Sequence, residues 1–440
     1  MVQTVTRNVD IEAALSEARQ AFLARNPKSF AKHTEACAVM PGGNTRSILF
    51  TSPFPLAIAR GEGCRLWDED GHDYVDFLGE YTAGIYGHSN PKIRAAVEKA
   101  LAGGINLGGH TVMEAKLARA ICQRFPSVKQ VRFTNSGTEA NLMALSTACV
   151  FTKRKKVMVF EGGYHGGVLY FGGGGIPTNM PFPWVLAQYN DSAGTKALLD
   201  RQGGEIAAIL VEPMAGAGGC VPADPAFLKM LREEATRHGC LLIFDEVMTS
   251  RLSPGGMQQT LGIMPDLTTL GKYIGGGMSF GGFGGREDVM GLYDPRRPDA
   301  VPHAGTFNNN VLTMSAGVVG LTELYTPDVA VALNARGDAL RERLDAACRK
   351  AGLPMQVIGR GSMMCVHFTS APLRSPVDTA KADQKLKELY YLDMVAAGIW
   401  LARRGMMILS IPIGDGECAR LAAAFEEFLS ARRSLIEAVK

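Results

Sequence analysis

The segment Leu267-Thr268-Thr269-Leu270-Gly271-Lys272-Tyr273-Ile274-Gly275-Gly276-Gly277 joins an apolar run to a lysine and then to three consecutive glycines. A second apolar run, Cys240-Leu241-Leu242-Ile243-Phe244, lies upstream and leads directly into Asp245. Such a run is typical of a fully buried strand in a parallel sheet. Ligands of these sheets gather at the carboxyl ends of the strands. The pattern predicts an α/β protein with a ligand site near Asp245 and Lys272.

Strand and helix patterns alternate between about residues 90 and 325. We expect helices at 91–102, 112–124, 137–150, 193–202 and 224–238 and strands at 130–134, 156–160, 206–211 and 240–244. This alternation predicts a large α/β domain around a mostly parallel sheet.

The two ends of the chain follow other patterns. Before residue 80 we expect a helix at 11–25, a turn at 41–44 and an antiparallel hairpin within 58–72. After residue 326 we expect helices at 329–351, 382–397 and 415–437 and short strands near 355–368 and 406–411. We therefore predict that 1–80 contributes to a smaller α+β domain, that 81–325 is the large ligand-binding domain, and that 326–440 is the C-terminal small domain.

Composition excludes several classes of protein. The 440 residues include 46 basic and 43 acidic side chains, a balance that favours a small-molecule enzyme over a nucleic-acid binder or a polybasic membrane binder. The nine cysteines form no CxxC pair, as is typical of free thiols in a reducing compartment. The first seven residues lack the features of a signal peptide, and no apolar segment approaches the ~20 residues that span a bilayer. We expect a cytoplasmic protein.

Lys272 has little charge compensation nearby in the sequence. Desolvation would lower the pKa of such a lysine towards the neutral amine, which attacks aldehydes to form a Schiff base. Asp245 could then pair with the protonated ring nitrogen of pyridoxal phosphate, which makes that cofactor an electron sink. The alternatives are a solvated surface lysine at 272 and, for the neighbouring Glu246, a carboxylate that caps the next helix.

Thr134-Asn135-Ser136-Gly137-Thr138 follows one predicted strand and opens a helix. Backbone N–H groups and hydroxyls at such a helix N-terminus bind phosphate. Ser136 as an ordinary N-cap is the alternative.

Gly162-Gly163-Tyr164-His165-Gly166-Gly167 follows another predicted strand. An aromatic ring flanked by glycines suits stacking on a flat cofactor, and the alternative is a turn with a buried tyrosine. We expect His165 to be a hydrogen-bonding support.

Other sites are excluded by their patterns. A P-loop would need glycine at 266 and Ser or Thr at 273, where Asp266 and Tyr273 stand. The eight histidines have no i,i+4 pairing and no carboxylate at ligand spacing, so we expect no metal. The serine-hydrolase elbow GxSxG is missing as well.

These motifs together resemble the class III aminotransferases, which are fold-type I pyridoxal-phosphate transferases. The resemblance covers essentially the whole chain and rests on five ordered motifs: Ser136–Ala140, Gly163–Gly166, Phe244–Met248, Leu270–Lys272 with Gly275–Gly277, and Gly305–Phe307. It implies that Lys272 carries pyridoxal 5'-phosphate, that Asp245 pairs with the ring nitrogen, and that Val247 and Tyr164 cover the two ring faces. It further implies that Ser136, Gly137 and Thr138 hold the phosphate together with Thr306 of a second subunit, so that a homodimer shares its active sites.

Within that family the layout is similar to that of glutamate-1-semialdehyde aminomutases, but segments 41–50, 80–88, 248–252 and 305–310 look much more like the β-phenylalanine (aromatic β-amino acid) aminotransferases. The Gly172–Gly175 loop has more glycine than those enzymes lead us to expect.

This resemblance implies a ping-pong transfer of the amino group from a β-amino acid, expected to be aromatic such as β-phenylalanine, to 2-oxoglutarate or pyruvate. Arg46 is the candidate for the donor carboxylate and Arg404 for the second carboxylate of the keto acid, because arginine suits carboxylates. Tyr81 and His165 complete the candidate substrate-binding residues. Surface arginines, an aminomutase, a broad ω-amine transaminase and a binding module without catalysis are the alternatives.

Overall fold

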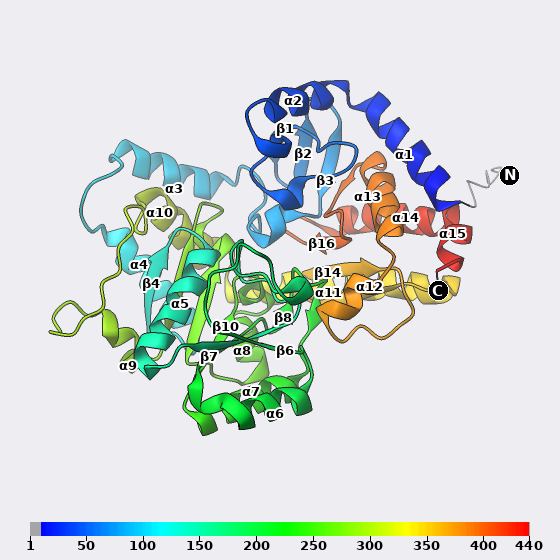
Figure 1. Ribbon diagram of the computed structural model, residues 1–440. Coiled ribbons are helices and arrows are strands. Elements are labelled where there is room, and N and C mark those ends of the chain that lie inside the picture. Colours follow the sequence, from blue (N-terminus) through cyan, green and yellow to red (C-terminus); the bar gives the residue numbers. More distant parts are fainter. Residues whose placement is uncertain (1–9, 440) are drawn as a thin grey trace.

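The computed structural model describes residues 10–439. The prediction that the chain has no signal peptide was made on the first seven residues, which lie outside this range. Within that range, no helix is long and apolar enough to cross a membrane. The chain folds as an α/β protein with one large sheet, two smaller sheets towards the chain ends (Figure 1), and a two-stranded sheet of β8 (Met214–Ala215) and β9 (Val221–Pro222).

The large sheet has the strand order β4-β12-β11-β10-β7-β5-β6. Its strands are β4 (Gln130–Thr134), β5 (Lys156–Phe160), β6 (Trp184–Ala187), β7 (Ile206–Val211), β10 (Leu241–Asp245), β11 (Leu267–Gly271) and β12 (Gly281–Gly285). Only β12 runs against the other strands of this sheet. The predicted mostly parallel sheet is therefore confirmed.

Both faces of this sheet are covered by helices, which is why its strands are continuously apolar. On β10, Leu242 and Phe244 pack with residues of α7 (Pro225–His238), whereas Leu241 and Ile243 pack with residues of α5 (Gly137–Thr152). Successive strand residues point to opposite faces, so one apolar run serves two cores. Further along the chain, α10 (Val311–Val319) packs on α3 (Pro91–Ala102) and α4 (Val112–Arg124).

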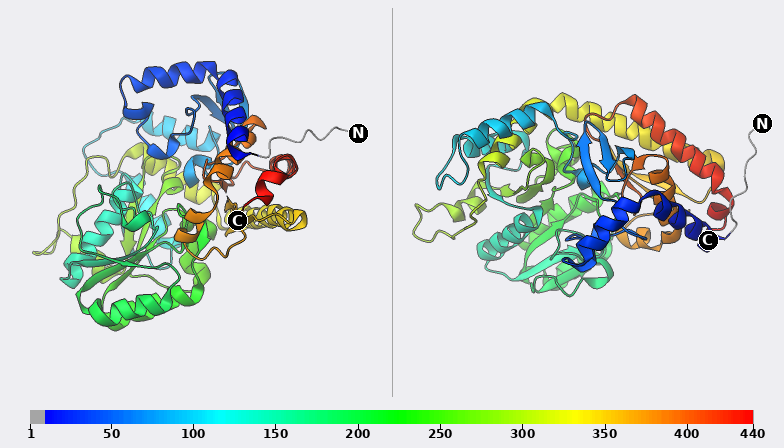
Figure 2. Two further views of the ribbon diagram at one scale, coloured as in Figure 1. Left: turned by 45° about the vertical axis from the view of Figure 1, so that its right-hand side comes forward. Right: turned by 90° about the horizontal axis from the view of Figure 1, so that it is seen from above.

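The two chain ends meet in a shared sheet. Strands β1 (Ile58–Glu62), β2 (Arg65–Asp68) and β3 (Asp73–Asp76) form the predicted antiparallel hairpin region, and β15 (Ile399–Trp400) pairs in parallel with β3. Helix α1 (Ile11–Arg25) packs on α13 (Gln384–Ala396). In Figures 1 and 2 the blue N-terminal elements accordingly lie beside the orange and red C-terminal ones.

The remaining C-terminal elements surround a third sheet. It is made of β13 (Gln356–Arg360), β14 (Met363–His367) and β16 (Met406–Ile408). Helices α11 (Pro327–Ala351), α12 (Pro376–Lys381), α14 (Asp415–Ala431) and α15 (Arg433–Glu437) complete this part.

Some elements were not predicted from the sequence. Helix α2 (Pro27–Cys37) and strands β6, β11 and β12 are examples, whereas the helix predicted at 193–202 is confirmed as α6 (Ser192–Gln202). Strand β12 has the sequence Gly281-Gly282-Phe283-Gly284-Gly285, which is a poor strand former. A Cβ added at Gly281 would lie 2.0 Å from the Ser136 carbonyl oxygen, so glycine is needed where this strand passes α5. The expected loop tip at 172–175 contains a single 3-10 turn, Gly172–Gly174.

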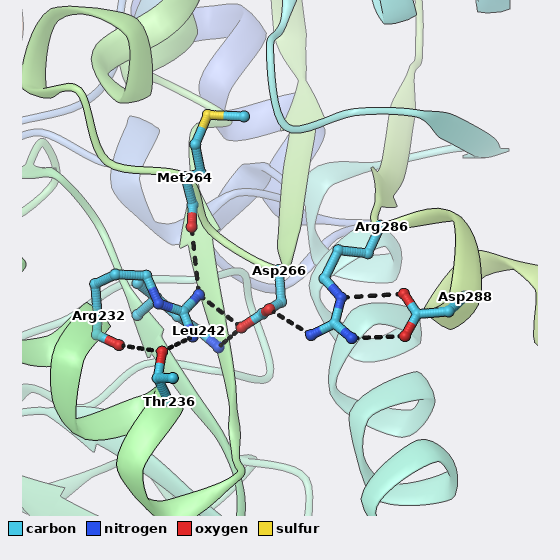
Figure 3. Close-up of polar contacts among 7 residues, drawn as sticks. All are labelled: Arg232, Thr236, Leu242, Met264, Asp266, Arg286 and Asp288. Carbon is cyan, nitrogen blue, oxygen red and sulfur yellow. Dashed lines mark hydrogen bonds and ion pairs between the residues drawn. The ribbon is translucent and has the colours of Figure 1, made fainter.

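An ion-pair network around the buried Asp266 fixes the strands that carry the candidate site (Figure 3). Asp266 directly precedes β11, at the end of the strand away from Lys272. Its Oδ2 accepts hydrogen bonds from Arg232 Nη1 and from the Leu242 backbone N–H, each at 2.8 Å, and its Oδ1 accepts from Arg286 Nη1 at 2.8 Å. One carboxylate therefore joins α7, β10 and the end of β12.

Asp266→Ala is expected to lower the free energy of unfolding by about 3 kcal/mol, because it leaves the buried Leu242 N–H and two arginine side chains without their common acceptor. Urea denaturation of the purified protein measures the change. Asp288→Ala is the matched control, since Asp288 is exposed and bonds only Arg286 in this network. It should lower the free energy of unfolding by less than about 1 kcal/mol. Equal losses in the two variants would contradict the assignment of Asp266 as the central residue.

Candidate active site

The candidate residues converge because several strands end at one edge of the large sheet. Strands β10 and β11 are parallel neighbours, with Asp245 paired to Thr269. Lys272 follows three residues after Thr269, directly beyond the end of β11. The loops after β4, β5 and β7 leave the sheet at the same edge. The structure thus brings together residues from distant parts of the sequence.

Lys272 begins a short 3-10 turn, Lys272–Gly275, and has a φ of 57°. A left-handed conformation is costly for a residue with a Cβ, and such strain is concentrated at functional sites. Burial lowers the pKa of the Lys272 amine to about 8; Glu80 and Asp245 oppose this shift, while Arg46 and Arg404 add to it. An appreciable fraction of the amine is therefore neutral and nucleophilic near neutral pH.

Asp245 is the last residue of β10 and is buried. Its Oδ2 accepts hydrogen bonds from Asn141 Nδ2 at 2.9 Å and lies 2.7 Å from His165 Nδ1, while its Oδ1 accepts from the Val247 backbone N–H at 3.0 Å. Asn141 is held in turn by Thr269, whose hydroxyl donates to its side-chain oxygen at 2.7 Å. These contacts fix the carboxylate in one orientation at the strand end.

His165 lies on the Asp245 side of the site. Its side chain is buried, and the Asn141 amide also donates to its backbone oxygen at 2.9 Å. The structure places His165 as a hydrogen-bonding support for Asp245, and no hydrogen bond joins it to Arg46, Tyr81 or Arg404 among residues 10–439.

Glu212 was not singled out by the sequence analysis, although it directly follows the buried strand β7. Its carboxylate accepts hydrogen bonds from the backbone N–H groups of Tyr164 at 3.2 Å and Gly216 at 3.1 Å. Burial raises the pKa of Glu212 to about 7; His165 opposes this shift and Asp245 adds to it. Glu212 thereby anchors the backbone of the Tyr164 loop. The strand-end rule that found Asp245 could also have found this residue.

The N-terminus of α5 forms a narrow cradle. Ser136 is its N-cap, because Ser136 Oγ accepts a hydrogen bond from the Glu139 backbone N–H at 3.1 Å. The N–H groups of Gly137 and Thr138 lie in the first turn and have no partner within the helix. A Cβ added at Gly137 would lie 3.0 Å from the Val247 side chain, so this cradle is already closely packed. Such a helix end attracts an anion.

Tyr164 is not buried. The residue is 42% exposed, with its ring centroid 5.9 Å from that of Tyr170. The alternative of a turn around a buried tyrosine is therefore wrong, and the ring is free to contact a ligand.

Arg46, Tyr81 and Arg404 are brought together from three separate segments. The guanidinium carbon of Arg46 lies 5.7 Å from the centroid of the Tyr81 ring, and that of Arg404 lies 5.2 Å from it. Both distances are in the range of cation–π contacts. Arg404 Nε is buried without a hydrogen-bond partner within residues 10–439. Arg404 is thus no ordinary surface arginine.

Thr306 lies apart from these residues. It is exposed, in the loop before α10, and lines a surface depression together with residues 105–111, 307 and 309–312. Among the described residues it makes no hydrogen bond to another candidate residue.

The prediction that no carboxylate lies at ligand spacing from a histidine is wrong. Glu234 and His238 are a carboxylate and a histidine four residues apart on α7, and Asp200 lies near both. However, Arg237 forms ion pairs with Asp200 and Glu234, so a cation already neutralises these carboxylates. This cluster lies outside the candidate site and gives no reason to place a metal there.

Together, these groups suit a flat, anionic ligand that carries an aldehyde and a basic ring nitrogen. Lys272 offers the amine, Asp245 a fixed carboxylate for the ring nitrogen, and the α5 N-terminus an anion cradle.

Comparison with known proteins identifies close relatives. The family described as aminotransferase class-III matches residues 50–172 and 178–422. The chain is 54% identical to the β-phenylalanine transaminase of Variovorax paradoxus, over 97% of this chain and 98% of that protein. The crystal structure of that species' β-phenylalanine aminotransferase superposes with a TM-score of 0.96, covering 97% of this chain and 99% of that chain at 54% identity.

More distant relatives carry other activities in their names. A glutamate-1-semialdehyde 2,1-aminomutase of Sorangium cellulosum is 39% identical over 92% of this chain and 97% of that protein. The structure of an ω-transaminase from Sphaerobacter thermophilus has a TM-score of 0.88 at 36% identity, covering 94% of this chain and 99% of that chain.

Proposed function

Because the chain belongs to the class-III aminotransferase family, we propose that it moves the amino group of an aromatic β-amino acid, such as β-phenylalanine, to 2-oxoglutarate or pyruvate. The observation that carries this proposal is the pair of guanidinium groups on Tyr81, close enough to Lys272 to shift its pKa. Two cations beside an aromatic side chain suit a substrate that has a carboxylate and an apolar ring.

The cofactor is pyridoxal 5'-phosphate, as in the relative whose structure has it bound. The residues fit this group: we assign Lys272 to its aldehyde, Asp245 to its ring nitrogen, and Ser136, Gly137 and Thr138 to its phosphate. Val247 and Tyr164 would contact the ring. When bound, the cofactor supplies an electron sink for the bond that breaks at the amine-bearing carbon.

Lys272 has two tasks in this proposal. Its neutral amine holds the cofactor, and once the donor amine has released it, Lys272 Nζ takes the proton from the amine-bearing carbon of the donor. Its lowered pKa suits a general base at neutral pH. Asn141 Nδ2, the Val247 N–H and His165 Nδ1 would hold the Asp245 carboxylate in place for the ring nitrogen.

Arg46 binds the carboxylate of the β-amino acid, and Arg404 binds the second carboxylate of 2-oxoglutarate. Both guanidinium groups lie against the Tyr81 ring, and we assign this side of the site to the donor ring. The same space accepts both substrates in turn, which gives ping-pong kinetics.

The active form is a homodimer with shared active sites. Support comes from large exposed apolar residues that line the same depression as Thr306, namely Ile105, Leu107 and Phe307. Exposed apolar groups near one loop are typical of an interface. In this arrangement Thr306 reaches the phosphate site of the partner. We also propose that 1–80 and 326–440 form one small domain beside the large domain 81–325.

An amino-donor panel tests the proposed function. The holoenzyme should form glutamate from β-phenylalanine only when 2-oxoglutarate is supplied, whereas an aminomutase would need no external acceptor. Arg46→Ala should lower kcat/KM for β-phenylalanine about 10- to 100-fold and leave a simple aryl amine nearly unchanged. Arg60→Ala, in an exposed ion pair on β1, is the control. Equal activity of the wild type on aryl amines and β-amino acids would overturn the assignment in favour of an ω-amine transaminase.

A further inference from the structure

The chain adopts a left-handed turn at Gly79–Thr82. The φ angles of Gly79, Glu80, Tyr81 and Thr82 are 51°, 46°, 52° and 83°. For residues with a Cβ this conformation costs about 1–2 kcal/mol each. A strained segment of this kind persists only where its surroundings hold it, and it is concentrated at functional sites.

Two buried groups hold this turn. Asp76 Oδ1 accepts hydrogen bonds from the N–H groups of Leu78 at 2.8 Å and Gly79 at 3.0 Å. On the other side, the fully buried Arg251 donates from Nη1 to the Thr82 carbonyl oxygen at 3.5 Å and from Nε to Ser362 Oγ at 3.0 Å. The backbone that carries Glu80 and Tyr81 is therefore fixed from both ends.

The turn presents Glu80 to Arg46. The two side chains form an ion pair, and their exposed fractions are 55% and 43%. Arg404 lies on the same Tyr81 ring as Arg46. Glu80, Arg46 and Arg404 all act on Lys272: Glu80 raises the pKa of its amine, and the two arginines lower it. The substrate side of the site thus has two cations and one anion.

We propose that Glu80 is a specificity-determining residue, whose carboxylate competes with substrate carboxylates for Arg46 and disfavours substrates that carry two of them. The inference rests on the proposed function, in which Arg46 and Arg404 bind carboxylates. A monocarboxylate adds one negative charge and leaves Arg404 near the displaced Glu80. A dicarboxylate occupies both arginines and leaves Glu80 beside two like charges, which is unfavourable at such short range.

Glu80→Gln tests this proposal, because glutamine keeps the shape of the side chain and removes its charge. The amine form of the enzyme is prepared by adding pyridoxamine phosphate to the apoenzyme, so the experiment does not depend on the amino donor. We expect the half-saturating concentration of 2-oxoglutarate to fall about 10-fold and that of pyruvate only about 2-fold. The difference should shrink at high salt, because these charges are partly exposed.

Non-reacting acids provide a second readout. Glutarate should inhibit Glu80→Gln more strongly than it inhibits the wild type, and butyrate should change little. Glu62→Gln is the matched control, because Glu62 forms an exposed ion pair with Arg60 on β1. This variant should leave inhibition by both glutarate and butyrate unchanged. If Glu80→Gln folds poorly, Glu80→Asn replaces it, since asparagine tolerates the left-handed conformation.

If Glu80→Gln changes the binding of dicarboxylates and monocarboxylates equally, or changes the binding of neither, the proposed role of Glu80 is overturned. Failure of the wild-type amine form to react with any keto acid would instead overturn the proposed function itself. The two failures are therefore distinguishable.

Discussion

Lys272→Ala is expected to lower kcat for amino transfer by about 1,000-fold or more, because the variant lacks both the nucleophile that holds the cofactor and the base that moves the proton. The purified variant should also lack the visible absorbance of the lysine-bound cofactor. Borohydride reduction followed by peptide mass spectrometry should locate the cofactor on Lys272 in the wild type and on no lysine in the variant.

The loss should reflect chemistry and not unfolding. Alanine keeps a Cβ at the φ of 57°, so it retains the backbone strain of the wild type. The variant apoprotein should accordingly unfold near the wild-type temperature. Lys272→Arg is the second variant: it keeps a cation but has no neutral amine at neutral pH, and it should be inactive as well. Persistence of the visible band in Lys272→Ala would place the cofactor attachment elsewhere.

Adding a small primary amine should restore part of the activity of Lys272→Ala. The cavity left by the lysine side chain can admit such an amine, which then acts as the missing base. No comparable gain is expected for the wild type. Rescue that rises with the basicity of the amine would support proton transfer by Lys272 Nζ, whereas absence of rescue together with full cofactor binding would argue against this second task.

Asp245→Asn is expected to lower kcat by about 100- to 1,000-fold, because a neutral side chain no longer stabilises positive charge on the ring nitrogen. The new amide NH2 group would face either Asn141 Nδ2 and His165 Nδ1, which contact Asp245 Oδ2, or the Val247 N–H, which donates to Oδ1. Steady-state kinetics at saturating cofactor and a cofactor titration measure the two effects. We expect weaker cofactor binding as well as slower turnover.

Asp68→Asn is the matched control. Asp68 is also buried, its Oδ2 lies 3.0 Å from His72 Nδ1, and it accepts a hydrogen bond from the Tyr74 hydroxyl at 2.6 Å, but it belongs to the N-terminal sheet. It should lose stability through the same loss of buried hydrogen bonds and keep most of its kcat. A similar fall in kcat for both variants would mean that Asp245 acts through stability alone.

Much of the fold was predictable because it depends on local patterns. The predicted bounds of α3, α4, β4, β5 and β7 agree with the structure residue for residue. A strand can be apolar at every residue when helices cover both faces of its sheet, so continuous apolar runs predicted the buried strands. The glycine strand β12 could not be predicted in this way, because its composition is dictated by the close approach of α5 and not by strand propensity.

The sequence by itself determined the fold class, the strand end that carries Asp245, the lysine before a glycine run at 272, and the helix N-terminus at Ser136, since each follows from residues that are near one another in the chain. Only the tertiary structure decided that Asn141 and His165 meet on Asp245, that Glu212 holds the Tyr164 loop, and that Glu80 faces Arg46. Those contacts join residues far apart in the sequence. They depend on how the strands pair and on the left-handed turn that Asp76 and Arg251 hold, and no local pattern encodes either.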